Sequence, residues 1–383
     1  MNRSLGERLG VAASAGGLAA GPPLPAASTQ ESRLAGQLER AGWHAVAPCV
    51  YCRDSDVPSP TGLAAGPLQG HLLPNACELR HCLFWDTETT GLAGAGTVIF
   101  LVGLGWLEGS RLRFHQVFLT DFPGERAFLE YIRAIISRYE VFVSYNGKAF
   151  DSTILKTRLV LSGMTMAFGY QLDLLYLARR FWRRVADNCR LATIERQVLG
   201  LERTGDVPGW MVPEIYFDSL RRGVLGELPV VFRHNQEDVV TLARLLDVVA
   251  QILRCGPEEE RPVPVDLTAV GAFLLQRGDV AGSALLRRAY RAGDAEAGRL
   301  LSLHLKRGGA WSDAVAVWED MRLVHGSCFA AVELSKFYEH RARDPAAALD
   351  CIAPFRGDTT GPDLEHRAAR LRAKLERAAL NGA

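Results

Sequence analysis

The sequence predicts an α/β domain with one mixed sheet flanked by helices, followed by an all-α domain of helical repeats. Two observations support this prediction. Residues 81–252 show three consecutive strand patterns and then alternating helix and strand patterns, which is typical of an antiparallel meander that continues into a mixed sheet. Residues from 265 onward show helical periodicity with a repeat at steps of 30 and 33 residues.

The composition is that of a soluble globular protein with two or three domains. The chain has 383 residues, of which 48% are hydrophobic and 23% are charged. No apolar run has membrane-helix length, and the first residues lack the apolar core of a secretory signal, so we expect a cytoplasmic protein without membrane contact. The eight cysteines are scattered, which is untypical of a disulfide framework.

The charge balance limits how the chain can bind nucleic acid. Its formal net charge is +1, from 44 basic and 43 acidic residues. This excludes a uniformly basic surface that holds polyanions by bulk electrostatics, so any nucleic-acid contact has to be local.

Composition shifts along the chain indicate five segments. Residues 1–40 are rich in Ala, Gly and Pro and are expected to be disordered, and residues 41–79 form a leader segment to which no function is assigned. The α/β domain follows over 80–253. A charged linker with three prolines at 254–264 then leads to the helical domain at 265–383.

Hydrophobic periodicity locates the elements of the α/β domain. The first three strands share alternating or continuous apolar patterns and short connections, so they should pair as neighbours. Strands are predicted at 83–88, 97–106, 111–119, 141–145 and 170–173, and helices at 125–139, 152–161, 191–199, 214–222 and 229–253.

In the helical domain, a large side chain stands nine residues before a small one in three successive units. The pairs are Leu275 with Ala284, Leu305 with Ala314, and Tyr338 with Ala347. This spacing predicts helical hairpins in which a large residue of the first helix packs on a small one of the second. The units resemble degenerate tetratricopeptide repeats, and an irregular helical bundle is the alternative.

Asp86 and Glu88 are the first candidate functional residues. They are two residues apart at the end of a buried strand, so both side chains project to the same face. Two adjacent carboxylates repel each other unless a cation lies between them, and oxygen ligands suit Mg²⁺ or Mn²⁺. An exposed strand end that carries two solvated carboxylates is the simpler reading of this pair alone.

Two further acidic positions occur in the same domain. The stretch "YNGKAFD" places Asn146 and Asp151 on the turn between a strand and a helix, and "HNQEDV" places His234 and Asp238 on one helical face. Read singly, Asp151 is a helix cap and the second pair is a solvated stripe. Together, the Asp86/Glu88 pair, Asp151 and Asp238 are three separate acidic positions in one domain, and this favours a metal site.

"DTETTGL", "YNGKAFD" and "HNQEDV" resemble, in this order, the three motifs of the four-carboxylate (DEDD) 3′–5′ exonuclease superfamily, whose fold is ribonuclease-H-like. The similarity is greater to the YprB-like predicted exonucleases of bacteria, some of which also carry tetratricopeptide repeats. Supporting stretches are "LDLLYLARRFW", "CRLATIERQVLG" and "GDVPGW".

The resemblance implies that Asp86, Glu88, Asp151 and Asp238 hold two divalent ions, with Asp86 as the bridging ligand. Two such ions activate a water on one side of a phosphodiester and neutralise the leaving oxygen on the other. His234 is then expected to orient or deprotonate the attacking water. In the superfamily a histidine stands five residues before the last Asp and a tyrosine four, so His234 occupies the tyrosine spacing.

Substrate contacts are expected around the motifs and in an arginine-rich stretch. The stretch "ARRFWRRVADNCR" interleaves arginines with Phe181 and Trp182, which predicts a surface that binds a nucleic-acid strand. The alternative is a buried aromatic pair surrounded by solvated arginines. "GDVPGWMVP" is interpreted as a rigid guide or a plain connection. The expected substrate-binding residues are Thr87, Thr90, Asn146, Lys148, Arg180 and Arg183.

The sequence therefore predicts a metal-dependent nuclease acting on DNA or RNA, and more narrowly a 3′–5′ exonuclease. A structure-selective endonuclease on the same fold is one alternative. A non-catalytic scaffold that binds a protein partner or nucleic acid through the helical repeats is the other.

Overall fold

The computed structural model describes residues 29–58, 71–73, 79–91, 94–109, 111–355 and 362–381. The chain divides into two compact units. The first extends to Arg254 and includes Arg261–Pro264, and the second comprises Cys255–Glu260 and the residues from Val265 onward. The boundary thus falls within residues 254–264, the predicted linker.

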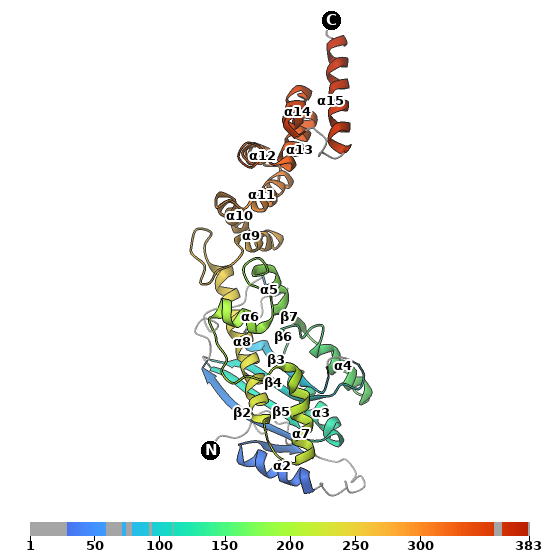
Figure 1. The fold of residues 1–383 in the computed structure, drawn as a ribbon, viewed down its shortest axis with the longest axis vertical. Coiled ribbons are helices and arrows are strands. Elements are labelled where there is room, and N and C mark those ends of the chain that lie inside the picture. The colour runs from blue at the N-terminus through green and yellow to red at the C-terminus, as the bar shows by residue number, and fades with distance from the viewer. Residues whose placement is uncertain are drawn as a thin grey trace. The chain divides into compact units, whose positions relative to one another are not determined.

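The first unit contains a seven-stranded mixed sheet in the order β1-β2-β5-β4-β3-β6-β7 (Figure 1). Strand β3 pairs in parallel with β6, and β6 with β7, whereas the other neighbours are antiparallel. The predicted meander and mixed sheet are therefore confirmed. The strands are β1 (His44–Ala47), β2 (Val50–Pro58), β3 (Cys82–Thr89), β4 (Ile99–Glu108), β5 (Arg111–Leu119), β6 (Val141–Ser144) and β7 (Tyr170–Asp173).

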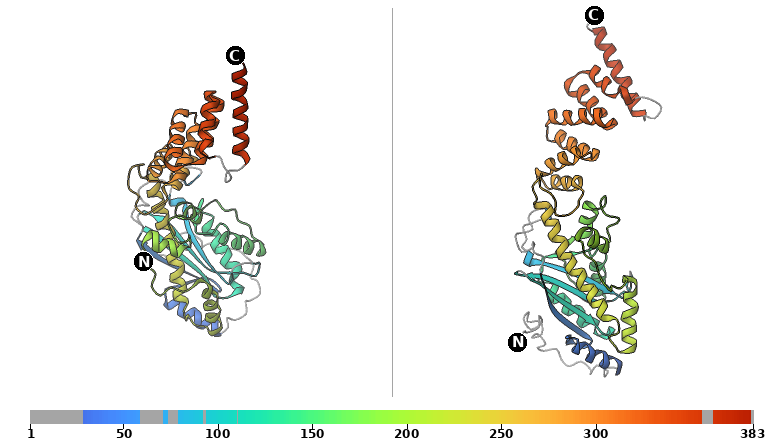
Figure 2. Two further views of the ribbon diagram at one scale, coloured as in Figure 1. Left: turned by 45° about the horizontal axis from the view of Figure 1, so that its top comes forward. Right: turned by 60° about the vertical axis from the view of Figure 1, so that its left-hand side comes forward.

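Helices pack against both faces of this sheet. On one face, His115 of β5 contacts Tyr131 of helix α3, and Thr87 of β3 contacts Asp151 of helix α4. On the other face, Gly103 of β4 lies against helix α8, which Figure 2 shows running along the sheet. The helices of this unit are α2 (Thr29–Arg40), α3 (Glu125–Ile136), α4 (Asp151–Leu161), α5 (Leu174–Phe181), α6 (Leu191–Ile194), α7 (Val212–Arg222) and α8 (Leu228–Arg254); short turns are η3 (Leu79–His81), η4 (Phe122–Gly124), the π-helical η5 (Glu195–Leu199) and η6 (Gly209–Met211).

The predictions for the N-terminal part need correction. Disorder was expected up to residue 40, yet Thr29–Arg40 forms helix α2, whose Leu34 and Leu38 are buried. Residues 41–79 were read as a leader outside the domain, yet β1 and β2 extend its sheet. Trp43 joins this segment to the core, with its ring 4.5 Å from that of Phe232 in α8. Residues 1–28 lie outside the described residues.

The second unit is helical throughout its described residues. Its helices are α9 (Leu267–Gln276), α10 (Ala281–Arg291), α11 (Ala295–Arg307), α12 (Trp311–His325), α13 (Cys328–Phe337), α14 (Pro345–Ile352) and α15 (Pro362–Asn381), with short turns η7 (Tyr338–Ala342) and η8 (Ala353–Phe355). Each helix from α9 to α14 packs against the next one along the chain. A C-terminal helical domain is therefore confirmed, and its assignment as tetratricopeptide repeats stays a prediction.

The predicted large-on-small packing is met with shifted partners. A Cβ at Gly282 would lie 2.8 Å from Cγ of Leu275, so Gly282 takes the place expected of Ala284. Ala314 is fully buried as expected, whereas in α14 the fully buried alanine is Ala348 and not Ala347. These shifts of one or two residues reflect the angle at which each pair of helices crosses, which spacing alone does not encode.

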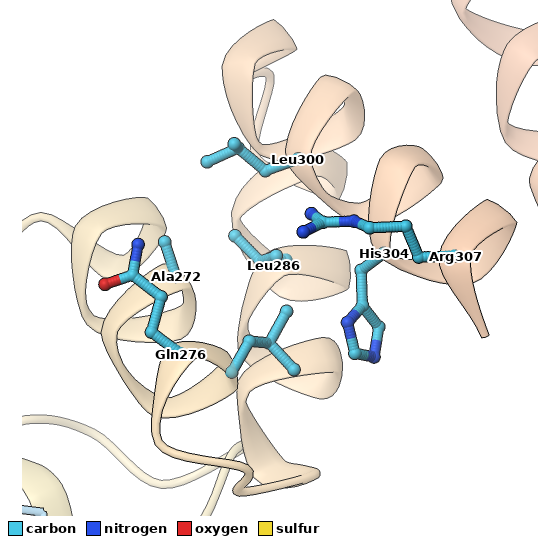
Figure 3. Close-up of a pocket in the computed structure, with 7 residues that line it drawn as sticks. Ala272, Gln276, Leu286, Leu300, His304 and Arg307 are labelled. Atoms are coloured by element: carbon cyan, nitrogen blue, oxygen red, sulfur yellow. The ribbon is translucent and has the colours of Figure 1, made fainter.

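A cavity of about 140 Å³ lies among helices α9, α10 and α11 (Figure 3). Leucines form most of its apolar wall, and His304 and Arg307 of α11 add polar groups. Its lining residues are Ala272, Leu275, Gln276, Leu286, Leu300, His304 and Arg307. Among all described residues, none of the helices combines the length and the hydropathy needed to cross a membrane.

Candidate functional site

The site begins at the carboxyl end of β3, where Asp86 and Glu88 project toward α8. Asp86 lies opposite Gly103 of β4, and Glu88 lies opposite Leu101. Asn235 of α8 donates a hydrogen bond from Nδ2 to Asp86 Oδ2 over 2.9 Å. The orientation of the Asp86 carboxylate is therefore set by a side chain of the opposing helix.

A buried pair of amides fixes Asn235 in turn. Gln116 Nε2 donates to Asn235 Oδ1 over 3.0 Å and to the Phe232 carbonyl over 2.8 Å, and both amide side chains are fully buried. A Cβ at Gly103 would lie 2.3 Å from Asn235 Oδ1, so the absence of a side chain in β4 makes room for this amide. The amide pair holds the Asp86 carboxylate in one direction.

Asp151 reaches the site from the other face of the sheet, at the start of α4. Thr87, between Asp86 and Glu88, donates its hydroxyl hydrogen to Asp151 Oδ1. The turn before Asp151 is shaped by Asn146, whose φ of +66° lies in the left-handed region that asparagine tolerates. The Asp151 carboxylate is thus placed by a specific turn and a specific hydroxyl.

Asp173, at the end of β7, fixes that turn. Its Oδ1 accepts from the Asn146 N–H over 2.8 Å, and its Oδ2 accepts from the Lys148 N–H over 3.2 Å. It also caps α5 by accepting from the Leu175 N–H over 3.1 Å. One buried carboxylate therefore ties the turn before Asp151 to the neighbouring parallel strand.

His234 and Asp238 lie one turn apart on α8, with His234 Nε2 3.7 Å from Asp238 Oδ2. The loop before α7 supplies the other contacts. His234 Nδ1 lies 2.6 Å from Asp206 Oδ1, and Arg203 donates from Nη2 to Asp238 Oδ1. Asp238 of α8 is thus paired with Arg203 from the loop before α7.

The charges of four carboxylates in this region influence one another's pKa values. Burial raises the pKa of Asp86 well above its ordinary value, and the charges of Asp238, Glu88 and Asp151 raise it further. Burial raises the pKa of Glu88 to about 8; His234 opposes this, while Asp238 and Asp151 add to it. Burial also raises the pKa of Asp151 to about 6. We call Asp86, Glu88, Asp151 and Asp238 the carboxylate cluster.

Opposing effects determine the pKa values of Asp238 and His234 in α8. Burial raises the pKa of Asp238 even though His234 and Arg203 oppose it. Burial lowers the pKa of His234, but the charges of Asp238 and Glu88 and the bond with Asp206 outweigh that effect and raise it. The imidazolium form of His234 is therefore favoured beside the cluster.

The donor set of the cluster fits a hard divalent ion, because all its ligands are carboxylate oxygens and their repulsion is relieved by a cation. As they stand, the described residues contain no group of three or more His, Cys, Asp or Glu side chains arranged to hold a metal ion. Three of the carboxylates instead have protein partners: Asp86 binds Asn235, Asp151 binds Thr87, and Asp238 binds Arg203.

The predicted substrate contacts are distributed unevenly. Asn146, Lys148 and Arg183 are exposed, and Arg180 is half-buried. The hydroxyl of Thr90 accepts from the Val98 N–H over 2.9 Å and that of Thr87 is bonded to Asp151, so both have structural partners. Substrate contact by these six residues stays a prediction.

The aromatic residues of the arginine-rich stretch do not form a stacking surface. Phe181 and Trp182 are fully buried, and Trp182 Nε1 donates to the Pro264 carbonyl over 2.9 Å. The alternative of a buried aromatic pair with an arginine rim is the correct one. Helix α5 ends here with its apolar face turned toward the core. The alternation of arginines and aromatic residues in the sequence does not show which of them are buried.

Several site residues were not singled out from the sequence, namely Gln116, Asp173, Glu195, Arg203, Asp206 and Asn235. Asn235 stands directly after His234 within the third motif, and Glu195 and Asp206 belong to stretches that supported the resemblance. Gln116 is a polar residue inside an apolar strand pattern, which is a usable signal for a buried partner.

A family profile, a bacterial protein and a solved structure are similar to this chain. The RNase_H superfamily profile matches residues 83–250, which begin in β3 and end in α8. The uncharacterized protein YprB of Bacillus subtilis (strain 168) is 32% identical over 283 residues, or 70% of this chain and 68% of that protein. Among solved structures, the family B DNA polymerase of the hyperthermophilic archaeon Pyrobaculum calidifontis is 16% identical, with a TM-score of 0.37. That match covers 68% of this chain and 36% of the polymerase chain, so this chain spans little more than a third of the polymerase.

Proposed function

This chain belongs to the family of Bacillus subtilis YprB and carries an RNase_H superfamily region, and we propose that it is a metal-dependent nuclease that hydrolyses phosphodiester bonds in DNA or RNA. More narrowly, we propose a 3′–5′ exonuclease of the four-carboxylate type. The observation that carries the proposal is the carboxylate cluster. Its members come from β3, α4 and α8, and their charges raise one another's pKa values.

Asp86, Glu88, Asp151 and Asp238 would hold two Mg²⁺ or Mn²⁺ ions. When bound, such ions supply an activated water and neutralise charge on the leaving oxygen. The chain itself contributes the orientation of the ligands through Asn235 for Asp86 and Thr87 for Asp151. These partners keep oxygen ligands in fixed directions, as outer-shell groups do at other metal sites.

His234 is proposed to orient the attacking water and accept its proton. Because Asp206 lies 2.6 Å from Nδ1, it favours a proton on that nitrogen and leaves Nε2 as the acceptor. The raised pKa of His234 means that the neutral, accepting form grows as pH rises above the ordinary histidine range.

Trp210 is proposed as a base contact for a single strand. It lies in η6, in the segment 203–211 that also carries Arg203 and Asp206, and its side chain is 75% exposed. An exposed indole four residues after Asp206 in the chain offers a stacking surface for an unpaired base. Lys148 and Arg183, both exposed, are the proposed phosphate contacts.

The geometry also accommodates the two alternatives. A structure-selective endonuclease would use the same carboxylates. A non-catalytic scaffold would bind a protein partner or nucleic acid through the helices of the second unit. A cytoplasmic location stays a prediction.

One experiment separates these functions. Purified wild type and Asp86→Asn are incubated with 3′-end-labelled, 5′-end-labelled and circular DNA and RNA, with Mg²⁺, with Mn²⁺ or with EDTA. The proposal expects metal-dependent release of the 3′ label by the wild type alone, while circles stay intact. Cut circles would show an endonuclease, and the absence of any cutting would favour the scaffold.

A further inference from the structure

Arg203 has no role in the proposed catalysis, yet it contacts several side chains of the site. Its Nη2 donates to both Asp238 Oδ1 and Glu195 Oε1. Its Nη1 lies 3.3 Å from His234 Nδ1 and 3.5 Å from Asp206 Oδ2. The side chain is only 13% exposed, so this guanidinium is a largely buried cation in direct contact with the carboxylate cluster.

Glu195 gives Arg203 a support that is independent of the cluster. Its side chain is 3% exposed and lies in the π-helical turn η5. Thr241, three residues after Asp238 on α8, donates its hydroxyl hydrogen to Glu195 Oε1. The bond between Arg203 and Glu195 therefore remains available if Asp238 turns toward another cation.

The contact with Asp238 conflicts with the ligand role proposed for that residue. Asp238 Oδ1 is occupied by the guanidinium, and Oδ2 faces His234 at 3.7 Å. Two cations close to one carboxylate repel each other strongly where water is scarce. A divalent ion at Asp238 and the present position of Arg203 therefore oppose each other.

We propose that Arg203 is an internal cation that competes with one of the two divalent ions for the Asp238 carboxylate and so sets the affinity of that metal position. The inference rests on the proposed function. It assigns Arg203 a regulatory role through Asp238 and no contact with the substrate. In the metal-free protein, Arg203 keeps Asp238 neutralised, and Glu195 retains Arg203 when the ion binds.

The test measures Mn²⁺ binding to the full chain by isothermal titration calorimetry, without substrate. Competition predicts that Arg203→Gln tightens the weaker Mn²⁺ binding event about tenfold, within the range by which outer-shell residues change metal affinity. Unchanged or weaker binding would overturn the inference, because a residue that merely positions Asp238 weakens the site when it is removed.

Two comparisons separate competition from a general charge effect. In an Asp238→Asn background, Arg203→Gln should leave Mn²⁺ affinity unchanged, and a persisting gain would contradict the inference. Arg233→Gln is the matched control, since Arg233 lies on α8, donates to the Gly205 carbonyl over 2.7 Å and lies 4.0 Å from Glu237, which is not a member of the cluster. It should bind Mn²⁺ as the wild type does, and tighter binding by this variant would also count against the inference.

A second variant covers the case in which Arg203→Gln does not fold. Arg203→Lys keeps the charge but cannot hold Glu195 and Asp238 with one planar guanidinium. We therefore expect a smaller gain in Mn²⁺ affinity than for Arg203→Gln. The absence of any gain would contradict the inference. If the wild type binds Mn²⁺ and the variants do not differ from it, only this inference fails. If no form binds Mn²⁺, the proposed function fails with it.

Discussion

Gly103 of β4 faces the side-chain amide of Asn235 in α8 so closely that a Cβ at Gly103 would lie 2.3 Å from Asn235 Oδ1. The same amide donates to Asp86. A backbone position without a side chain therefore controls a carboxylate on the neighbouring strand through one intermediate residue.

Gly103→Ala is expected to displace Asn235 and to weaken Mn²⁺ binding and nuclease activity by about 10- to 100-fold, the cost typical of losing an outer-shell partner. Gly105→Ala is the matched control, because a Cβ there would lie 2.7 Å from Val239 Cγ1 and disturb the same helix away from Asn235. Both variants should lower the melting temperature. Equal losses of Mn²⁺ affinity in the two would contradict the role of Asn235.

The metal-free protein is expected to lose stability as pH rises. The pKa of Asp151 is raised to about 6 and that of Glu88 to about 8, so the folded state binds protons that the unfolded state releases near pH 4. This contribution is present below about pH 4 and is lost as pH rises through 6 and 8. In EDTA the melting temperature should fall by on the order of 5 °C between pH 5 and pH 9.

Two controls accompany that measurement. Mn²⁺ should restore the melting temperature most at high pH, where the carboxylates are ionised. Glu88→Gln should flatten the upper part of the profile, because it removes the group that titrates there. A wild-type melting temperature independent of pH in EDTA would show that burial and mutual repulsion do not raise the pKa values of these carboxylates.

Trp210→Ala is expected to weaken binding of a short single-stranded oligonucleotide by about 5- to 150-fold, which corresponds to the 1–3 kcal/mol measured for stacking one base on an aromatic side chain. Fluorescence anisotropy in an Asp86→Asn background checks this without digestion. Tyr176→Ala is the control, since Tyr176 is 55% exposed on α5 and has no proposed contact. Unchanged affinity in Trp210→Ala would remove Trp210 from the substrate path.

Glu339 is expected to hold the last helix of the second unit. Its side chain is 1% exposed and accepts hydrogen bonds from Arg367, Arg370 and Lys374 of α15. Burial alone would raise the pKa of Glu339, but the bonds from Lys374 and Arg370 lower it to about 2. This contribution is therefore present above about pH 4 and is lost as pH falls toward 2.

Glu339→Gln should destabilise the docking of α15 by about 1–3 kcal/mol, because three cations lose a buried negative charge and one of its two acceptor oxygens. Limited proteolysis within α15 should become faster by a corresponding factor. Glu376→Gln, an exposed change on the same helix, serves as the control. Equal cleavage rates in the two variants would show that Glu339 does not hold the helix.

Local pattern predicted much of the fold. The predicted bounds of β5 and β7 agree with the structure, and the long helical pattern predicted α8 to within one residue at each end. The pattern failed where packing decides. Helix α2 is polar on average and follows an Ala/Gly/Pro-rich stretch, and its contacts with helix α7 and strand β1 bring it into the core.

The candidate site shows the same division. Asp86 and Glu88 follow from strand alternation, and His234 and Asp238 follow from helical spacing. Gln116, Asn235 and Arg203 act on the cluster through contacts between segments 35 to 149 residues apart, and no local period carries that information. Phe181 and Trp182 were ambiguous for the same reason, because their burial depends on how α5 packs.

The most direct test of the central claim is anomalous diffraction at the manganese edge from crystals grown with Mn²⁺. The account predicts two anomalous peaks about 4 Å apart, bonded to oxygens of Asp86, Glu88, Asp151 and Asp238. No peak at these carboxylates, under conditions in which the same preparation digests nucleic acid, would contradict it.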